Sequence, residues 1–140
     1  MNKIDRRKLI ETALGKREAT LKLENANLVN VFSGEIYMAN VYLYNEYIAD
    51  VVEIENDKNK KAEKIVDLKG KYLAPGFIDS HLHIESSHLT PYHFAEAVIT
   101  KGTTTIIAAP HDIGTAFGAA GVDYMIEASD NLHMTQYFLI

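Results

Sequence analysis

The spacing of apolar side chains divides the chain into two stretches with different patterns. Residues 5–14 carry apolar side chains at helical spacing and are followed by Gly15, which predicts a short amphipathic helix. Residues 20–55 carry short runs of β-branched and aromatic residues separated by Asn, Ser and Gly, which predicts several short antiparallel strands. Residues 65–68 and 72–74 predict one more pair of strands joined by a turn.

From Pro75 onward, predicted strands alternate with predicted helices. The strands are expected at 77–83, 103–108 and 134–140, and the helices are expected to start at Pro91 and to cover about 115–129. This βαβαβ order predicts an α/β fold with parallel strands and right-handed crossovers. We therefore expect two segments, 1–74 and 75–140.

Composition and charge exclude several classes of function. The chain has 140 residues and no cysteine, which excludes disulfides, a thiolate nucleophile and cysteine metal ligands and favours a cytoplasmic protein. Its formal charge of −5 argues against nonspecific binding to nucleic acid. No apolar stretch approaches the roughly 20 residues of a membrane span, and no apolar segment typical of a secretion signal follows the basic N-terminus. The polar run 55–61 predicts a solvated turn.

The strongest candidate for chemistry is the pair His81 and His83 at the end of the predicted strand 77–83. Residues at i and i+2 of a strand point to the same face, which is also the face of Asp79. Neutral imidazole is the commonest metal ligand, and parallel α/β folds place their sites at strand ends. We therefore predict a pair of metal ligands; the alternative is two exposed histidines without a ligand.

Three further residues are candidates for binding metal or substrate. Glu85 is a further ligand, a partner that fixes an imidazole, or an ordinary loop glutamate. His111 and Asp112 follow the strand 103–108, and adjacent strands lie about 4.8 Å apart, so His111 either reaches the same site or faces solvent. For His88, His93 and His133 we expect no role in the site.

The segment from Ala74 to His83 resembles the first-strand signature of the amidohydrolase superfamily of metal-dependent hydrolases. Further segments resemble the bacterial adenine deaminase family within it: His83-Ile84-Glu85-Ser86-Ser87, Leu89-Thr90-Pro91, Gly102-Thr103-Thr104-Thr105, Pro110-His111-Asp112-Ile113 and residues 30–37. This resemblance runs over nearly the whole chain in one order.

The resemblance implies the start of a (β/α)8 barrel over 75–140 and part of a small β-sandwich over 1–74. It implies hydrolysis of adenine to hypoxanthine and ammonia in purine salvage, with a small-molecule substrate and with neither nucleic acid nor a membrane as partner. His81 and His83 would hold a divalent ion, with manganese or iron favoured and zinc as the alternative. The full-length form would be a homo-oligomer. The active-site base is not identified.

The chain departs from the family pattern at three positions after the second predicted strand. Ala109 replaces an aspartate, Asp112 a glutamate and Gly114 an asparagine. If those side chains hold metal or substrate, we expect impaired activity or altered specificity.

Length is a further departure, because such a barrel needs about 200–250 residues and residues 75–140 supply only three of its eight strands. We therefore expect an N-terminal fragment that is inactive alone and that aggregates or dimerises. The alternatives are a fragment of a dihydroorotase-like or hydantoinase-like enzyme, and a non-catalytic remnant.

Overall fold

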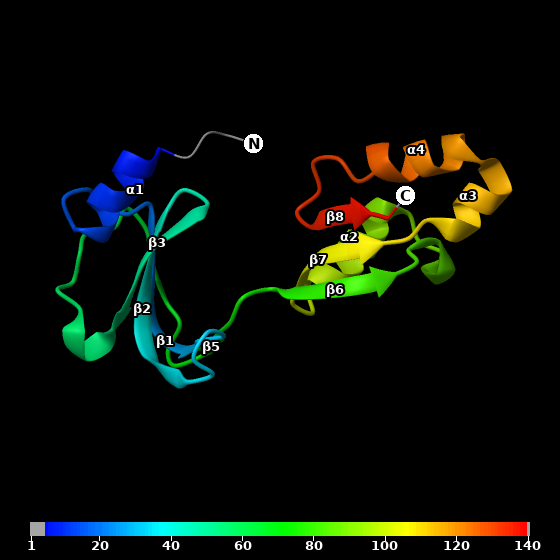
Figure 1. The fold of residues 1–140 in the computed structure, drawn as a ribbon. Coiled ribbons are helices and arrows are strands. Elements are labelled where there is room, and N and C mark those ends of the chain that lie inside the picture. Colours follow the sequence, from blue (N-terminus) through cyan, green and yellow to red (C-terminus); the bar gives the residue numbers. More distant parts are fainter. Residues whose placement is uncertain (1–4, 140) are drawn as a thin grey trace. The chain divides into compact units, whose positions relative to one another are not determined.

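The computed structural model describes residues 5–139 and separates the chain into two compact units, with the boundary between Pro75 and Gly76 (Figure 1). The chain is mixed α/β, with one sheet in each unit. None of the helices among residues 5–139 has both the length and the apolar character that crossing a membrane requires.

The first unit begins with helix α1 (Arg6–Ala13), which confirms the predicted helix over 5–14. Asp5 caps it by accepting a hydrogen bond from the Lys8 amide at 3.2 Å. The chain leaves the helix at Gly15 with φ +70°, a left-handed conformation that glycine adopts readily. The helix contacts strands β2 and β3 (Ile36–Tyr44 and Tyr47–Glu53).

The sheet of the first unit has the order β3-β2-β1-β4, and β5 also pairs with β1. Strands β1 (Leu21–Val29), β2 and β3 pair antiparallel, as the pattern over 20–55 predicts. A short 3-10 turn follows at Ile54–Asn56.

The predicted pairing of 65–68 with 72–74 is wrong. Strands β4 (Ile65–Asp67) and β5 (Tyr72–Leu73) do not pair with each other, but both pair in parallel with β1. The turn between them has positive φ at Lys69 and Gly70, and the Asn27 side chain donates a hydrogen bond to the Gly70 carbonyl at 2.5 Å. This contact holds the turn against β1, so the chain bends along one strand instead of folding back on itself.

The prediction of a solvated turn over 55–61 is wrong for Asp57, whose side chain is only 5% exposed. Its carboxylate accepts hydrogen bonds from the Tyr42 hydroxyl at 2.7 and 2.9 Å and from the Asn40 amide at 2.6 Å, and the Lys22 ammonium lies 3.6 Å away. Lys22, Asn40 and Tyr42 are buried in β1 and β2, and buried polar groups need partners. The run supplies the carboxylate that these groups require.

The second unit alternates strands and helices, as predicted. Its strands pair in parallel in the order β6-β7-β8: β6 (Phe77–Leu82), β7 (Thr103–Ala108) and β8 (Thr135–Phe138). The last residue of the predicted strand 134–140 lies outside the described residues. Helix α2 (Pro91–Ile99) starts after Thr90, whose hydroxyl caps it by accepting from the His93 amide at 3.4 Å.

A single helix over 115–129 is wrong, because the structure has two shorter helices, α3 (His111–Phe117) and α4 (Ala119–Glu127). They are separated by Gly118, whose φ of +62° and ψ of −148° fit no helix and are rarely adopted by other residues. A Cβ atom at Gly121 would lie 2.7 Å from the Ile113 carbonyl oxygen, so this glycine allows the two helices to pack closely.

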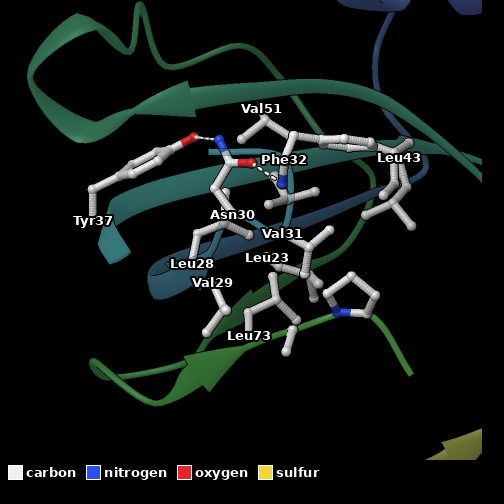
Figure 2. A pocket seen from close by; sticks show the side chains of 14 residues that line it. Leu23, Leu28, Val29, Asn30, Val31, Phe32, Tyr37, Leu43, Val51 and Leu73 are labelled. Carbon is white, nitrogen blue, oxygen red and sulfur yellow. Dashed lines mark hydrogen bonds between the residues drawn. The ribbon is translucent and has the colours of Figure 1, made fainter. Parts of the chain in front are cut away.

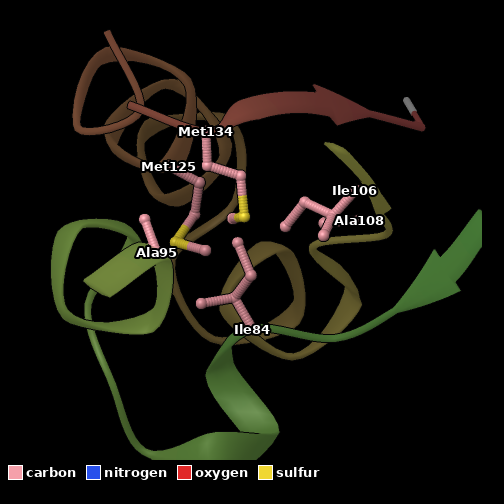
Figure 3. Close-up of a cluster of buried hydrophobic side chains, with 6 residues drawn as sticks. All are labelled: Ile84, Ala95, Ile106, Ala108, Met125 and Met134. Carbon is pink, nitrogen blue, oxygen red and sulfur yellow. The ribbon is translucent and has the colours of Figure 1, made fainter. Parts of the chain in front are cut away.

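The core of the second unit lies between the sheet and its helices. Figure 3 shows its buried side chains gathered together: Ile84, Ala95, Ile106, Ala108, Met125 and Met134. Leu82 packs against this cluster from β6. The predicted strand 77–83 ends one residue early, at Leu82, and Ile84 already has helical backbone angles, so His81 is the last histidine of the strand and His83 follows it.

Candidate metal centre

The carboxyl ends of β6 and β7 bring three of the predicted site residues together. The ring centroids of His81 and His83 lie 5.3 Å apart with the rings perpendicular, at 89°. The ring of His111, the first residue of α3, lies 5.1 Å from that of His83 at 40°. The structure thus places one imidazole cluster where the two parallel strands end.

A backbone carbonyl fixes the ring of His83. Its Nδ1 lies 2.5 Å from the carbonyl oxygen of Ala109, and because this oxygen can only accept, Nδ1 carries the proton. The lone pair of the neutral ring is then on Nε2. The same carbonyl accepts a hydrogen bond from the His111 amide at 2.9 Å. Ala109 therefore holds both His83 and His111 without using its side chain.

These residues fit a divalent metal ion. A histidine that binds metal through one ring nitrogen usually donates the other N–H to a carbonyl or carboxylate, and His83 has this arrangement. Imidazole suits zinc, iron and related ions. Among residues 5–139, however, no group of three or more His, Asp or Glu side chains is placed to hold one ion. The described residues therefore bring two candidate ligands together, His81 and His83, and not a complete coordination shell.

Hydrogen bonds join the segment of Glu85 to the segment of Asp112. Glu85 lies in a 3-10 turn (Glu85–Ser87), and its Oε1 accepts a hydrogen bond from the Asp112 amide at 3.1 Å. The Ser86 hydroxyl donates to Asp112 Oδ2 at 3.2 Å. Within the described residues, Oε2 of Glu85 is buried and has no hydrogen-bond partner. Glu85 therefore contacts the first turn of α3.

The remaining histidines have other surroundings. His93 lies in the first turn of α2, with Nδ1 2.8 Å from the Thr90 hydroxyl. His88 is exposed with φ +60°, and His133 is exposed in a loop.

His111 also lines a hollow of about 540 Å³ on the second unit. The other residues around this hollow are Pro110, Gly114, Thr115, Val122 and Leu139. The imidazole cluster thus borders open space on one side.

An apolar cavity of about 410 Å³ lies in the first unit, against its sheet (Figure 2). Its main polar side chains, Asn30 and Tyr37, hydrogen-bond to each other at 3.3 Å, and Asn30 also accepts from the Phe32 amide at 3.0 Å. The lining contains no carboxylate and no imidazole, and its two main polar side chains are paired with each other.

Comparisons with known proteins agree with this geometry. Residues 72–140 match the Amidohydrolase family. The adenine deaminase of Kosmotoga olearia is 43% identical over 140 residues, which is 100% of this chain and 23% of the relative. That of Clostridium acetobutylicum is 45% identical over 131 residues, 94% of this chain and 22% of the relative. The chain thus spans less than a quarter of the length of these curated relatives.

Solved structures share the fold. A D-aminoacylase, described as defining a novel subset of amidohydrolases, superposes with a TM-score of 0.55 at 25% identity, over 65% of this chain and 18% of that one. An N-acyl-D-glutamate deacylase from Bordetella bronchiseptica, solved with zinc and a phosphonate inhibitor, gives a TM-score of 0.50 at 20% identity, over 66% and 19%. Residues 72–140 thus match the Amidohydrolase family, and the chain as a whole is similar to a stretch of adenine deaminases.

Proposed function

We propose that this chain is the N-terminal part of a metal-dependent adenine deaminase, which converts adenine and water into hypoxanthine and ammonia. The observation that carries the proposal is the His83 ring, whose Nδ1 is bound to the Ala109 carbonyl while its centroid lies 5.3 Å from that of His81. The similarity to adenine deaminases over the whole chain supports this choice of substrate.

The proposed chemistry replaces the amino group on C6 of adenine by oxygen. A divalent ion, when bound, supplies the Lewis acidity that makes water a nucleophile near neutral pH. His81 and His83 would hold it through their imidazoles, and the Ala109 carbonyl keeps the His83 ring in the required tautomer. We propose manganese or iron, with zinc as the alternative.

We also propose that the second unit is the start of a (β/α)8 barrel and the first unit part of a β-sandwich. The parallel order β6-β7-β8 with helices between the strands supports the barrel. The complete protein would be a cytoplasmic, homo-oligomeric enzyme of purine salvage. The lack of cysteine supports the cytoplasm.

The departures from the family pattern are compatible with this proposal. Ala109 contacts His83 and His111 through its backbone oxygen, so this contact does not require an aspartate. Asp112 binds Ser86 through its own shorter side chain.

The test is to express the complete reading frame that contains these codons, supply manganese, and measure hypoxanthine formed from adenine. Dihydroorotate and hydantoin serve as competing substrates. We expect turnover of adenine that is lost in His81→Ala and His83→Ala and retained in His133→Ala, because His133 lies in an exposed loop. Turnover of dihydroorotate or hydantoin without turnover of adenine contradicts the proposal.

A further inference from the structure

Two segments far apart in the sequence are joined beside the imidazole cluster. The Asp112 amide donates to Glu85 at 3.1 Å, and the Ser86 hydroxyl donates to the Asp112 carboxylate at 3.2 Å. The two hydrogen bonds run in opposite directions between the turn Glu85–Ser87 and the first turn of α3. We call these residues, Glu85, Ser86 and Asp112, the clasp.

The clasp supplies what helix α3 lacks at its start. The first amides of a helix have no partner within the helix and are usually capped by a side chain at the preceding position. That position in α3 is Pro110, which gives no side-chain cap. Glu85 replaces the cap from a different segment, and its negative charge is favoured near the amino end of a helix.

The residue held by this arrangement is His111. On its N-terminal side, the His111 amide donates a hydrogen bond to the Ala109 carbonyl. On its C-terminal side, the amide of the next residue, Asp112, donates to Glu85. Its ring lies 5.1 Å from that of His83 and borders the hollow of about 540 Å³. The orientation of the first turn of α3 therefore decides where the third imidazole lies.

We propose that Glu85 is a positioning residue, which caps α3 from outside the helix and so fixes the His111 ring between His83 and the adjoining hollow. This inference rests on the proposed function in one respect: only if His81 and His83 bind a metal ion does the position of the His111 ring matter for catalysis. Glu85 acts here through the Asp112 amide, and it is not itself assigned as a metal ligand.

The experiment uses NMR on the whole 140-residue chain, without metal or substrate. In the unaltered chain we expect a nuclear Overhauser effect between the rings of His83 and His111. We also expect protection of the Asp112 amide from hydrogen exchange, since first-turn amides without a cap exchange freely. Rapid exchange of this amide, or no contact between the rings, overturns the proposal without any mutation.

The variants separate a positioning role from a general loss of structure. Glu85→Ala should remove the ring-to-ring signal, shift the His111 ring resonances and speed exchange of the Asp112 amide by about tenfold. Glu85→Gln keeps an acceptor oxygen and should restore all three, while Glu127→Ala, an exposed glutamate of α4, should change none.

Circular dichroism checks that each variant is folded. An unchanged His111 in folded Glu85→Ala overturns the proposal, and so does loss of the ring-to-ring signal in folded Glu85→Gln. Because no substrate is used, failure of the complete protein to deaminate adenine does not affect the NMR result. Likewise, a negative NMR result does not affect the proposed deamination of adenine.

Discussion

At the scale of single residues, the site depends on a backbone atom as much as on side chains. Alternation along the predicted strand 77–83 places His81 and His83 on one face, although β6 ends at Leu82, and the position of His111 after β7 marks it as a candidate for the same site. The role of the Ala109 carbonyl could not be predicted, because every residue carries such an oxygen and only the fold decides which one meets a ring.

We expect His83→Ala and His81→Ala each to weaken binding of manganese or zinc to this chain by at least about tenfold, because each removes one of the two imidazoles proposed as ligands. Isothermal titration calorimetry measures the change. The control is His133→Ala, which should bind as the unaltered chain does. An equal loss of affinity in the control would assign the binding to scattered histidines.

A second prediction concerns Asp57 in the first unit. Burial acts to raise the pKa of its carboxyl, but hydrogen bonds from Tyr42, Asn40 and the Asn59 amide, with the charge of Lys22, outweigh burial and hold the pKa below the ordinary 3.8. The ionised form is therefore preferred in the folded state. Its contribution to the free energy of unfolding is fully present above the ordinary pKa and is lost as the pH falls through the lower, folded-state pKa.

Asp57→Asn should therefore lower the free energy of unfolding near pH 7 by about 1.5–3 kcal/mol and flatten its decline below about pH 4. Urea unfolding at a series of pH values measures both effects. Asp67→Asn, at an exposed position, should change both the free energy of unfolding near pH 7 and its decline in acid by less. If the free energy of unfolding of Asp57→Asn falls in acid as steeply as that of the unaltered chain, other carboxyls cause the decline and the prediction is wrong.

At the scale of elements, local patterns predict the order of strands and helices but not all of their pairings. The parallel pairing of β4 and β5 with β1 joins segments distant in sequence, and the turn at Lys69 and Gly70 reads locally like a hairpin. The break between α3 and α4 is missed for a related reason. A glycine within a helical pattern is often tolerated, so the pattern alone does not reveal the backbone angles of Gly118.

The packing of α3 on α4 gives a matched pair of glycine substitutions. In Gly121→Ala the new Cβ would lie 2.7 Å from the Ile113 carbonyl oxygen, so we expect destabilisation by about 1–3 kcal/mol. In Gly114→Ala it meets only Val122 at 3.5 Å, and alanine favours a helix, so we expect a stabilisation of up to about 1 kcal/mol. Urea unfolding compares the two, and equal effects would contradict close packing at Gly121.

At the scale of the whole molecule, the two units have different roles in the proposed enzyme. The imidazole cluster belongs to the second unit, while the first unit holds an apolar cavity and the buried network around Asp57. The change of pattern at Pro75 is visible in the sequence because an alternation of strands and helices replaces short sheet strands. The amidohydrolase fold is predicted from the motif after Pro75.

The 140-residue chain alone should not convert adenine to hypoxanthine, because its described residues hold no group of three or more His, Asp or Glu side chains placed around one ion. A coupled assay for ammonia, with manganese present, measures the rate against buffer. The complete reading frame serves as the positive control. Sustained turnover by the short chain would mean that two imidazoles suffice and would refute this prediction.

The hold of the Ala109 carbonyl on His83 has a consequence for protein engineering. A substitution scan replaces side chains and leaves every carbonyl oxygen in place, so a loss of function at the buried position 109 would be attributed to packing although its oxygen orients the His83 ring. Deleting or inserting one residue between Thr103 and Ala109 moves that oxygen along β7 while leaving both histidines intact. Libraries that vary the length of this segment would therefore expose a dependence that libraries of point mutations overlook.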